Sequence, residues 1–248
     1  MSPDIRQAQI ARYRELHPEA ADKPDEEVLQ LLAEFQRRTR QQREAEQEGQ
    51  QREIVVERNA RFLARRPRKY RQAMADHPDV VAWVEGYVAA LPPTSFLRIT
   101  ERPHFNSLFL YGTAGTGKTW QALGIPALLA EKNVPADYSY IRAVDYLDRQ
   151  QNSTFETKEA LFEEARDARL LILDDLLAGG DHKRSVSDLY RLLDARFIDE
   201  RPTIMTCNVS GPDLVKALGE RIVDRLREDA KSVKMVGDSR RKFRPIAS

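Results

Sequence analysis

The sequence has few residues of the kinds that stabilise secreted proteins or that anchor a chain in a membrane. Its 248 residues include a single cysteine, Cys207, which cannot form an internal disulfide or build a cysteine-rich zinc site. No apolar run approaches the length of a transmembrane helix, and the N-terminus lacks the apolar core of a signal peptide. We therefore expect a cytoplasmic protein with no membrane partner.

An excess of charge of one sign is also missing. Lys and Arg together number 40 and Asp and Glu 39, which gives a formal net charge of +1 at pH 7. A chain balanced in this way is not expected to bind nucleic acid over its whole surface, so any DNA contact would need a local basic patch. The 41% of hydrophobic residues is nevertheless enough for a buried core.

Glycine is almost absent from residues 1–66, where Gly49 stands alone. Apolar residues recur at helical spacing before residue 36, whereas residues 37–53 are nearly all Arg, Gln and Glu. This charged stretch cannot bury a core and is either a solvated connecting helix or a flexible linker. We predict a helical region over residues 1–66 that rests on a partner, followed by a second domain over residues 67–248.

The second domain begins with helical sequence, in which His77-Pro78-Asp79 is typical of a helix start. From Phe105 onward, short apolar strands alternate with helical segments, and this alternation predicts a mostly parallel sheet covered by helices. The predicted strands are Ser107–Tyr111, Tyr138–Ala143, Leu170–Leu173, Thr203–Thr206 and Ser232–Val236.

The first of these strands runs into a glycine-rich loop that matches the pattern G-x-x-x-x-G-K-[ST], with helical sequence after it. Glycines let the backbone wrap around phosphate oxygens, and the start of the helix adds the positive end of its dipole. Lys118 would lie near the β- and γ-phosphates, and the Thr119 hydroxyl would bind Mg²⁺. The predicted ATP-binding residues are Gly112, Thr113, Ala114, Gly115, Thr116, Gly117, Lys118 and Thr119.

A second acidic site follows the strand Leu170–Leu173, which ends in Asp174 and Asp175. The carboxyl ends of parallel strands face the crevice where ligands bind. We therefore expect Asp174 to hold Mg²⁺ and Asp175 to polarise the attacking water. A carboxylate directly after the metal-binding Asp argues against a small-molecule kinase, and the absence of an Asn-Lys-x-Asp signature favours adenine over guanine.

Three weaker signals lie toward the C-terminus. Asn208 closes the strand before it and could orient water, although Asn also ends ordinary strands. Arg221 and Arg225 lie one turn apart on a predicted helix, where they could reach a neighbouring subunit or simply form intrahelical ion pairs. The basic residues after Lys231 could contact bound nucleotide or a nucleic-acid backbone, or form only a flexible tail.

Together these pieces resemble the AAA+ ATPases, and in particular the DnaC/DnaI-type replicative helicase loaders and their IstB relatives. The resemblance covers about Tyr70 to Arg241. It is most specific at Leu218–Leu226, which resembles the loader box that carries the arginine finger, and at Gly237–Arg241, which resembles the terminal box. It implies a three-layer P-loop (ASCE) α/β fold with a central five-stranded parallel sheet and a small all-helical N-terminal region.

By position, the resemblance makes Asn208 the first sensor, Arg225 the finger that acts in trans and Arg241 the second sensor. It implies ATP and Mg²⁺ as cofactors, a DnaB-type helicase bound by the N-terminal region, single-stranded DNA as a further partner, and a homo-oligomeric spiral. Members usually carry Glu where this chain has Asp175, and the shorter side chain predicts slow turnover. An IstB-like transposition helper and an ATP-switched scaffold with negligible hydrolysis remain alternative hypotheses.

Overall fold

The computed structural model describes residues 3–91, 105–176, 182–209 and 212–237. The chain divides into two compact units, Met1–Glu53 and Ile54–Ser248. The described helices include none that is both long and apolar enough to cross a bilayer.

The first unit is helical and has a small core. It consists of α1 (Pro3–Leu16), a 3-10 turn η1 (Pro18–Ala20) and the beginning of α2 (Asp25–Ala64). Its buried apolar residues are Ile10, Ala20 and Val28. Arg14 helps to close the turn, because its guanidinium donates to the Lys23 carbonyl oxygen at 2.6 Å.

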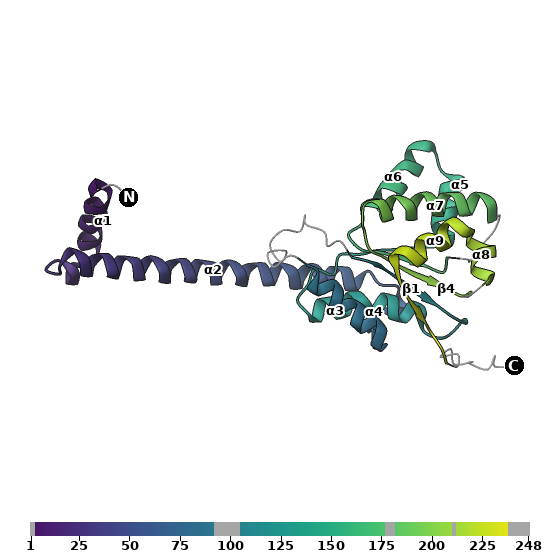
Figure 1. Cartoon of the computed structure of the whole chain (residues 1–248), viewed down its shortest axis with the longest axis horizontal. Coiled ribbons are helices and arrows are strands. Elements are labelled where there is room, and N and C mark those ends of the chain that lie inside the picture. Colours follow the sequence, from purple (N-terminus) through teal and green to yellow (C-terminus); the bar gives the residue numbers. More distant parts are fainter. Residues whose placement is uncertain (1–2, 92–104, 177–181, 210–211, 238–248) are drawn as a thin grey trace. The chain divides into compact units, whose positions relative to one another are not determined.

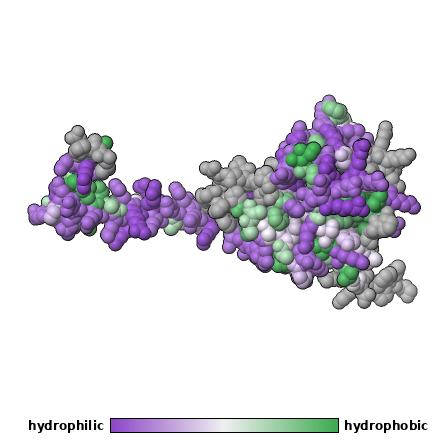
Figure 2. Space-filling view, in the orientation of Figure 1, coloured by the Kyte–Doolittle hydropathy of each residue, from purple (hydrophilic) through white to green (hydrophobic). Residues whose placement is uncertain are grey.

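The charged stretch of residues 37–53 is a helix rather than a flexible linker, since it lies within α2. Its side chains are largely exposed, and i,i+4 contacts such as Arg40–Glu44 support the helix. Figure 2 shows this part of α2 covered by hydrophilic residues, whereas hydrophobic residues gather around α1. The helix is therefore maintained by local sequence, without a buried face along this stretch.

The second unit begins with the last turns of α2. Asn59 is 4% exposed, its amide nitrogen donates to the Val134 carbonyl oxygen at 2.9 Å, and its amide oxygen accepts from Ala136 N–H at 2.7 Å. Arg58 also forms an ion pair with Asp137. The division between the units thus falls after Glu53 in the structure, whereas the sequence suggested a boundary after Arg66.

The rest of this unit alternates helices and strands in the order that the sequence predicted (Figure 1). Its elements after α2 are η2 (Arg68–Tyr70), α3 (Pro78–Ala89), β1 (Ser107–Tyr111), α4 (Lys118–Glu131), β2 (Ser139–Arg142), α5 (Ala143–Asn152), α6 (Phe155–Asp167), β3 (Leu171–Asp174), α7 (His182–Ile198), β4 (Thr203–Cys207), α8 (Pro212–Leu218), α9 (Glu220–Asp229) and β5 (Ala230–Lys234).

The strands form one parallel five-stranded sheet in the order β2-β3-β4-β1-β5. The first four predicted strands are confirmed to within about one residue at either end. The fifth was placed two residues too late, because β5 follows α9 without a loop and pairs Ala230 with Ser107. Val236, predicted to be within it, lies beyond its end and is 72% exposed.

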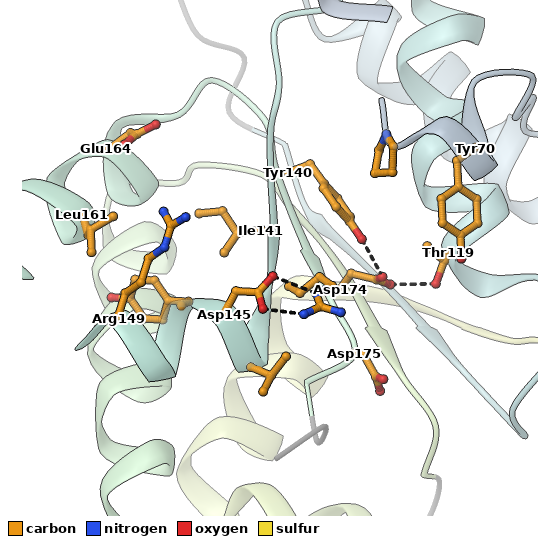
Figure 3. Close-up of a pocket in the computed structure, with 14 residues that line it drawn as sticks. Tyr70, Thr119, Tyr140, Ile141, Asp145, Arg149, Leu161, Glu164, Asp174 and Asp175 are labelled. Carbon is orange, nitrogen blue, oxygen red and sulfur yellow. Dashed lines mark hydrogen bonds and ion pairs between the residues drawn. The ribbon is translucent and has the colours of Figure 1, made fainter. Parts of the chain in front are cut away.

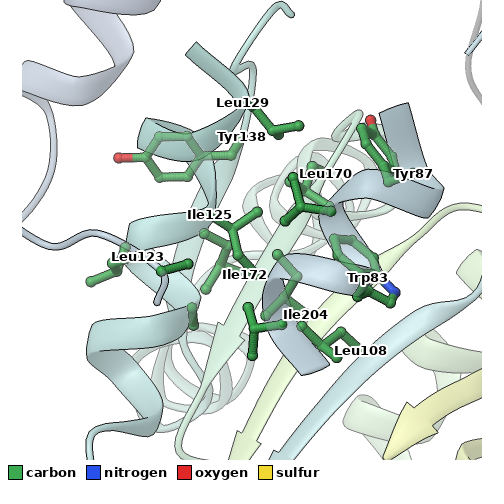
Figure 4. Close-up of a cluster of buried hydrophobic side chains, with 14 of the residues drawn as sticks. Trp83, Tyr87, Leu108, Leu123, Ile125, Leu129, Tyr138, Leu170, Ile172 and Ile204 are labelled. Atoms are coloured by element: carbon green, nitrogen blue, oxygen red, sulfur yellow. The ribbon is translucent and has the colours of Figure 1, made fainter. Parts of the chain in front are cut away.

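Helices cover both faces of the sheet, so the predicted three-layer fold is confirmed. Alternate residues of a strand point to opposite faces. Leu108 and Leu110 belong to the cluster that α3 and α4 complete, with Trp83 among its members (Figure 4). Phe109, between them, belongs to the second cluster, built with α5 to α9. Burial on both faces explains why the central strands are continuous apolar runs.

The start of α3 also agrees with the sequence. The helix begins at Pro78, whose missing N–H is not needed in the first turn, and the His77 ring nitrogen Nδ1 accepts from Asp79 N–H at 3.3 Å. This end of α3 is held close to the P-loop helix α4 by contacts described below.

Candidate nucleotide-binding site

The glycine-rich loop lies between β1 and α4, as predicted. Its glycines Gly112, Gly115 and Gly117 have φ angles of 143°, 91° and 97°. These values lie in the region that only glycine adopts without strain. Helix α4 begins at Lys118, so the N–H groups of its first turn face the loop, where they can bind an anion.

Gly112 is required by space as well as by conformation. A Cβ atom at this position would lie 2.2 Å from the Met235 carbonyl oxygen. The backbone N–H of Gly112 also donates to the Cys207 carbonyl oxygen at 3.3 Å. The start of the loop is thus fixed between the end of β4 and the segment that follows β5.

The Lys118 side chain is buried in the loop that precedes it. Its Nζ atom donates to the carbonyl oxygens of Gly112 at 2.8 Å and Thr113 at 2.7 Å. Thr116 donates to the same Thr113 oxygen at 3.0 Å, which closes the loop on itself. The ammonium group is therefore held where the loop would surround phosphate oxygens. Ala114, the remaining loop residue, is exposed at its tip.

Asp174 lies at the end of β3, is 5% exposed and accepts from three hydroxyl groups. Oδ1 accepts from Thr206 Oγ1 at 2.6 Å. Oδ1 also accepts from Thr119 Oγ1 at 2.8 Å, and Oδ2 accepts from the Tyr140 hydroxyl at 3.0 Å (Figure 3). The structure thus brings together the two predicted metal ligands, Thr119 and Asp174, from separate elements.

The oxygen atoms of Thr119 and Asp174 fit the Mg²⁺ ion of a bound nucleotide. Mg²⁺ prefers hard oxygen ligands, keeps several waters and usually takes only one or two groups from the protein, with phosphates supplying others. The described residues contain no cluster of three or more His, Cys, Asp or Glu side chains that could hold a metal by themselves.

Asp175 differs from its neighbour in both backbone and exposure. Its φ angle is 58°, a left-handed conformation that Asp tolerates better than most residues. Its N–H donates to Thr206 Oγ1 at 2.8 Å, and its carboxylate accepts from Asn208 Nδ2 at 2.6 Å. The predicted water-activating carboxylate and the predicted first sensor are therefore in contact.

Two adjoining cavities surround these groups. One, of about 530 Å³, is lined by Lys118, Asp175 and Asn208. The other, of about 690 Å³, is lined by Tyr140, Asp174 and residues of α5. Tyr70, Thr119 and Asp175 line both. Thr119, one of the two predicted metal ligands, thus lies where the two cavities meet, and Asp174, the other, lines the larger cavity.

Residues 67–76, which connect α2 to α3, form part of the cavity wall and were not predicted to do so. Lys69, Tyr70 and Asp76 line the smaller cavity. The fully buried Gln121 of α4 holds this segment, because its Oε1 accepts from the N–H groups of Asp76 at 3.0 Å and His77 at 3.1 Å.

Arg66 holds the other end of the same segment. It is 7% exposed and donates to the carbonyl oxygens of Ala73 at 2.6 Å and Leu123 at 3.2 Å. Burial lowers the pKa of this guanidinium, although not enough to neutralise an arginine. Arg66 lies in a charged stretch of sequence, which gives no sign that it has a partner more than 50 residues away. The cavity wall formed by residues 67–76 was therefore not predicted.

Tyr140 is a further residue that the sequence did not reveal. It was read only as part of an apolar strand, yet its hydroxyl reaches the Asp174 carboxylate. Burial, and then the negative charge of Asp174, raise the pKa of Tyr140 well above its usual range. The hydroxyl therefore stays protonated and donates to the carboxylate at any physiological pH.

Arg225, one of the two predicted arginines, is not brought to these cavities. Arg225 of α9 lines neither, and its guanidinium forms an ion pair with Asp194 at 3.1 Å and lies 4.4 Å from the centre of the Phe197 ring. Its side chain is 35% exposed, so part of it remains accessible from outside the subunit. Arg241 lies outside the described residues.

Comparisons with solved structures show a shared fold. The chain superposes on the structure of DnaI with a TM-score of 0.55 and 24% identity, covering 71% of this chain and 94% of that one. For the DnaC helicase loader the TM-score is 0.55 and the identity 19%, covering 68% of this chain and 100% of that one. A structure of replication initiator DnaA bound to AMPPCP and single-stranded DNA gives 0.51 and 18%, covering 69% and 51%.

Sequence relatives agree with this result. The chromosomal replication initiator protein DnaA of Lacticaseibacillus casei is 26% identical over 135 residues, which are 53% of this chain and 30% of the relative. The DnaA of Nitrosospira multiformis is 26% identical over 149 residues, 58% and 30% of the two chains. The chain thus spans about a third of the length of these relatives. Residues 81–231, more than half of the chain, match the model of the bacterial DnaA ATPase domain, and the chain therefore belongs to this family of AAA+ ATPases.

Proposed function

We propose that the protein is an ATP-dependent loader that assembles on a DnaB-type replicative helicase and helps to place it on single-stranded DNA. The loader role is supported by the fold that the chain shares with DnaI and with the DnaC helicase loader, over 94% and 100% of those structures, and by the loader-like segment Leu218–Leu226. In this proposal the first unit binds the helicase, and the second binds ATP at subunit interfaces of a spiral.

ATP binding is supported above all by the convergence of Lys118, Thr119 and Asp174. They lie beside a loop whose glycines have φ angles that only glycine adopts without strain. Lys118 and the first-turn N–H groups of α4 would bind the phosphates. Thr119 and Asp174 would hold Mg²⁺, which neutralises phosphate charge when bound.

We expect slow hydrolysis because the side chain of Asp175 is short. Its carboxylate already accepts a hydrogen bond from Asn208, and its backbone is held in a left-handed conformation. As general base it would take a proton from the attacking water, and Asn208 would orient both groups. A side chain shorter by one bond than glutamate lies farther from that water, and a misplacement of about 1 Å can cost roughly a hundredfold in rate.

Arg225 would act across a subunit interface, because it lines neither cavity of its own subunit. To reach a neighbour's nucleotide, its guanidinium would leave Asp194. Arg241 would contact the nucleotide of its own subunit as the second sensor.

Steady-state ATP hydrolysis with and without single-stranded DNA tests the enzymatic part. We expect a low rate that DNA stimulates and that Lys118→Ala abolishes. Arg225→Ala should abolish hydrolysis while an isolated subunit still binds ATP, and Asp175→Glu should raise the rate. Equal loss of binding and hydrolysis in Arg225→Ala would show that the arginine acts within its own subunit.

The loader role is tested by size-exclusion chromatography of the full chain mixed with a hexameric DnaB-type helicase. We expect a stable complex with ATP that Phe35→Ala and Leu16→Ala weaken, since both side chains are exposed apolar groups of the first unit. Binding to a transposase in place of the helicase would favour the IstB-like alternative.

A further inference from the structure

The second oxygen of the Asp174 carboxylate has its own hydrogen-bond donor, which belongs to no nucleotide-binding motif. Thr119 and Thr206 both donate to Oδ1, whereas Tyr140 donates to Oδ2 at 3.0 Å. The tyrosine comes from β2, the outermost strand beside β3, where Tyr140 pairs in register with Ile172. Its side chain therefore reaches along the sheet toward the end of the next strand.

We propose that Tyr140 is a positioning residue that fixes the Asp174 carboxylate, and that it thereby sets how much more tightly the protein binds ATP with Mg²⁺ than without it. This inference rests on the proposed function as an ATP-binding protein.

The two oxygens of Asp174 differ in the number of donors that hold them. A hydroxyl that coordinates Mg²⁺ uses a lone pair of its oxygen and keeps its O–H, so Thr119 and Thr206 would both still donate to Oδ1. Oδ2 accepts from Tyr140. Without Tyr140 the second oxygen has no other donor among the hydrogen bonds of the described residues, and the group can turn about its χ2 angle.

Arg142 does not take this place, although it is the residue of β2 that pairs in register with Asp174. Its guanidinium makes a two-pronged contact with Asp145, with Nε 2.7 Å from Oδ2. Arg142 is thus paired with another carboxylate, whereas the neutral hydroxyl of Tyr140 donates to Asp174. A neutral donor orients the carboxylate without cancelling the charge that attracts Mg²⁺.

The chain offers a matched control two residues earlier. Tyr138 lies on the same side of the chain as Tyr140, because the side chains of a strand alternate. Its hydroxyl donates to the Phe62 carbonyl oxygen at 3.2 Å and makes no contact with Asp174. Tyr138→Phe and Tyr140→Phe therefore each remove one half-buried hydroxyl, but only the second removes a bond to the metal-binding carboxylate.

The test is the affinity of the full chain for a fluorescent ATP analogue, measured once with Mg²⁺ and once with EDTA. We expect Tyr140→Phe to lower the ratio of the two affinities about tenfold, the usual effect of losing a partner of a metal ligand, with the EDTA value unchanged. Tyr138→Phe should leave both values as they are. Thermal unfolding of both variants checks that each is folded.

Two results would overturn the inference. An unchanged ratio in Tyr140→Phe would show that Asp174 is positioned without the tyrosine. An equal loss of affinity with and without Mg²⁺ would show that the ring contacts the nucleotide itself. Failure of the unsubstituted chain to bind the analogue under either condition would instead contradict the proposed function, so the two failures are distinguishable.

The electron paramagnetic resonance spectrum of Mn²⁺ gives a second measurement that does not depend on hydrolysis. In the presence of ADP, Tyr140→Phe should require about tenfold more Mn²⁺ for half-saturation of the bound signal, and Tyr138→Phe should not. Identical Mn²⁺ titrations for the two variants would again contradict a role for Tyr140.

Discussion

The two compact units are stabilised in different ways. The first buries Ile10, Ala20 and Val28 and leaves Leu16 and Phe35 at 67% and 47% exposure. The second has a continuous apolar cluster on each face of its sheet. The difference indicates that the second unit is stabilised by its own core, whereas the first has helices maintained by local sequence and an apolar surface suited to a partner.

The same contrast exists within a single helix. In α2 the stretch of residues 37–53 is exposed and has side-chain pairs one turn apart, whereas Val55 and Asn59 farther along are buried. Helical sequence alone therefore does not show where a domain begins. The boundary is set by which turns of the helix find partners elsewhere in the chain.

Truncation of the chain should have the largest effect on stability. A chain that begins at Ile54 should unfold at the same denaturant concentration as the second unit of the full chain. A chain that begins at Pro67 should lose at least about 4 kcal/mol, since it leaves Val134 C=O and Ala136 N–H unpaired and removes the buried Arg66. Urea unfolding followed by circular dichroism measures both, and equal midpoints would show that the last turns of α2 are dispensable.

One glycine substitution in each unit tests the same difference in stabilisation. Gly112→Ala should cost about 3 kcal/mol, because a Cβ atom would lie 2.2 Å from the Met235 carbonyl oxygen at a φ of 143°. Gly49→Ala should instead stabilise the chain by about 0.5 to 1 kcal/mol, since nothing lies within 4 Å of that Cβ and Ala is the better helix former. Thermal unfolding should shift in opposite directions. A stable Gly112→Ala variant that still binds ATP would contradict the geometry of the loop.

A substitution in the core of the first unit should have an effect confined to that unit. Val28→Ala removes two buried methyl groups and should cost about 2 kcal/mol of the packing between α1 and α2. Amide hydrogen exchange should increase over residues 5–35 and stay constant in the sheet. Faster exchange in the β-strands would show that the stabilities of the two units are linked.

Much of the fold could be predicted because its signals are local. The central strands are apolar on both faces, so β1, β3 and β4 appear as short hydrophobic runs. The edge strand β5 has one buried side chain, Val233, among exposed neighbours, and its position was therefore predicted two residues late.

The candidate site, too, has residues that local sequence predicts and residues that it does not. The glycine pattern and the paired aspartates are motifs of adjacent residues, and the structure brings these groups together. Tyr140 acts over 34 residues and Gln121 over 45, with side chains that could equally serve as ordinary parts of a strand and a helix. Contacts of this kind depend on strand order and helix packing, which one sequence does not specify by spacing.

The outer strand β5 bears on how copies of the chain can associate. It ends the sheet, and Lys231 and Lys234 are exposed along it. Extending the sheet with a strand from another molecule would bring these ammonium groups against a second backbone and remove them from water, which is how natural edge strands discourage such pairing. Association of copies through β5 is therefore expected to use side-chain surfaces, where contacts can form and release without exchange of backbone hydrogen bonds.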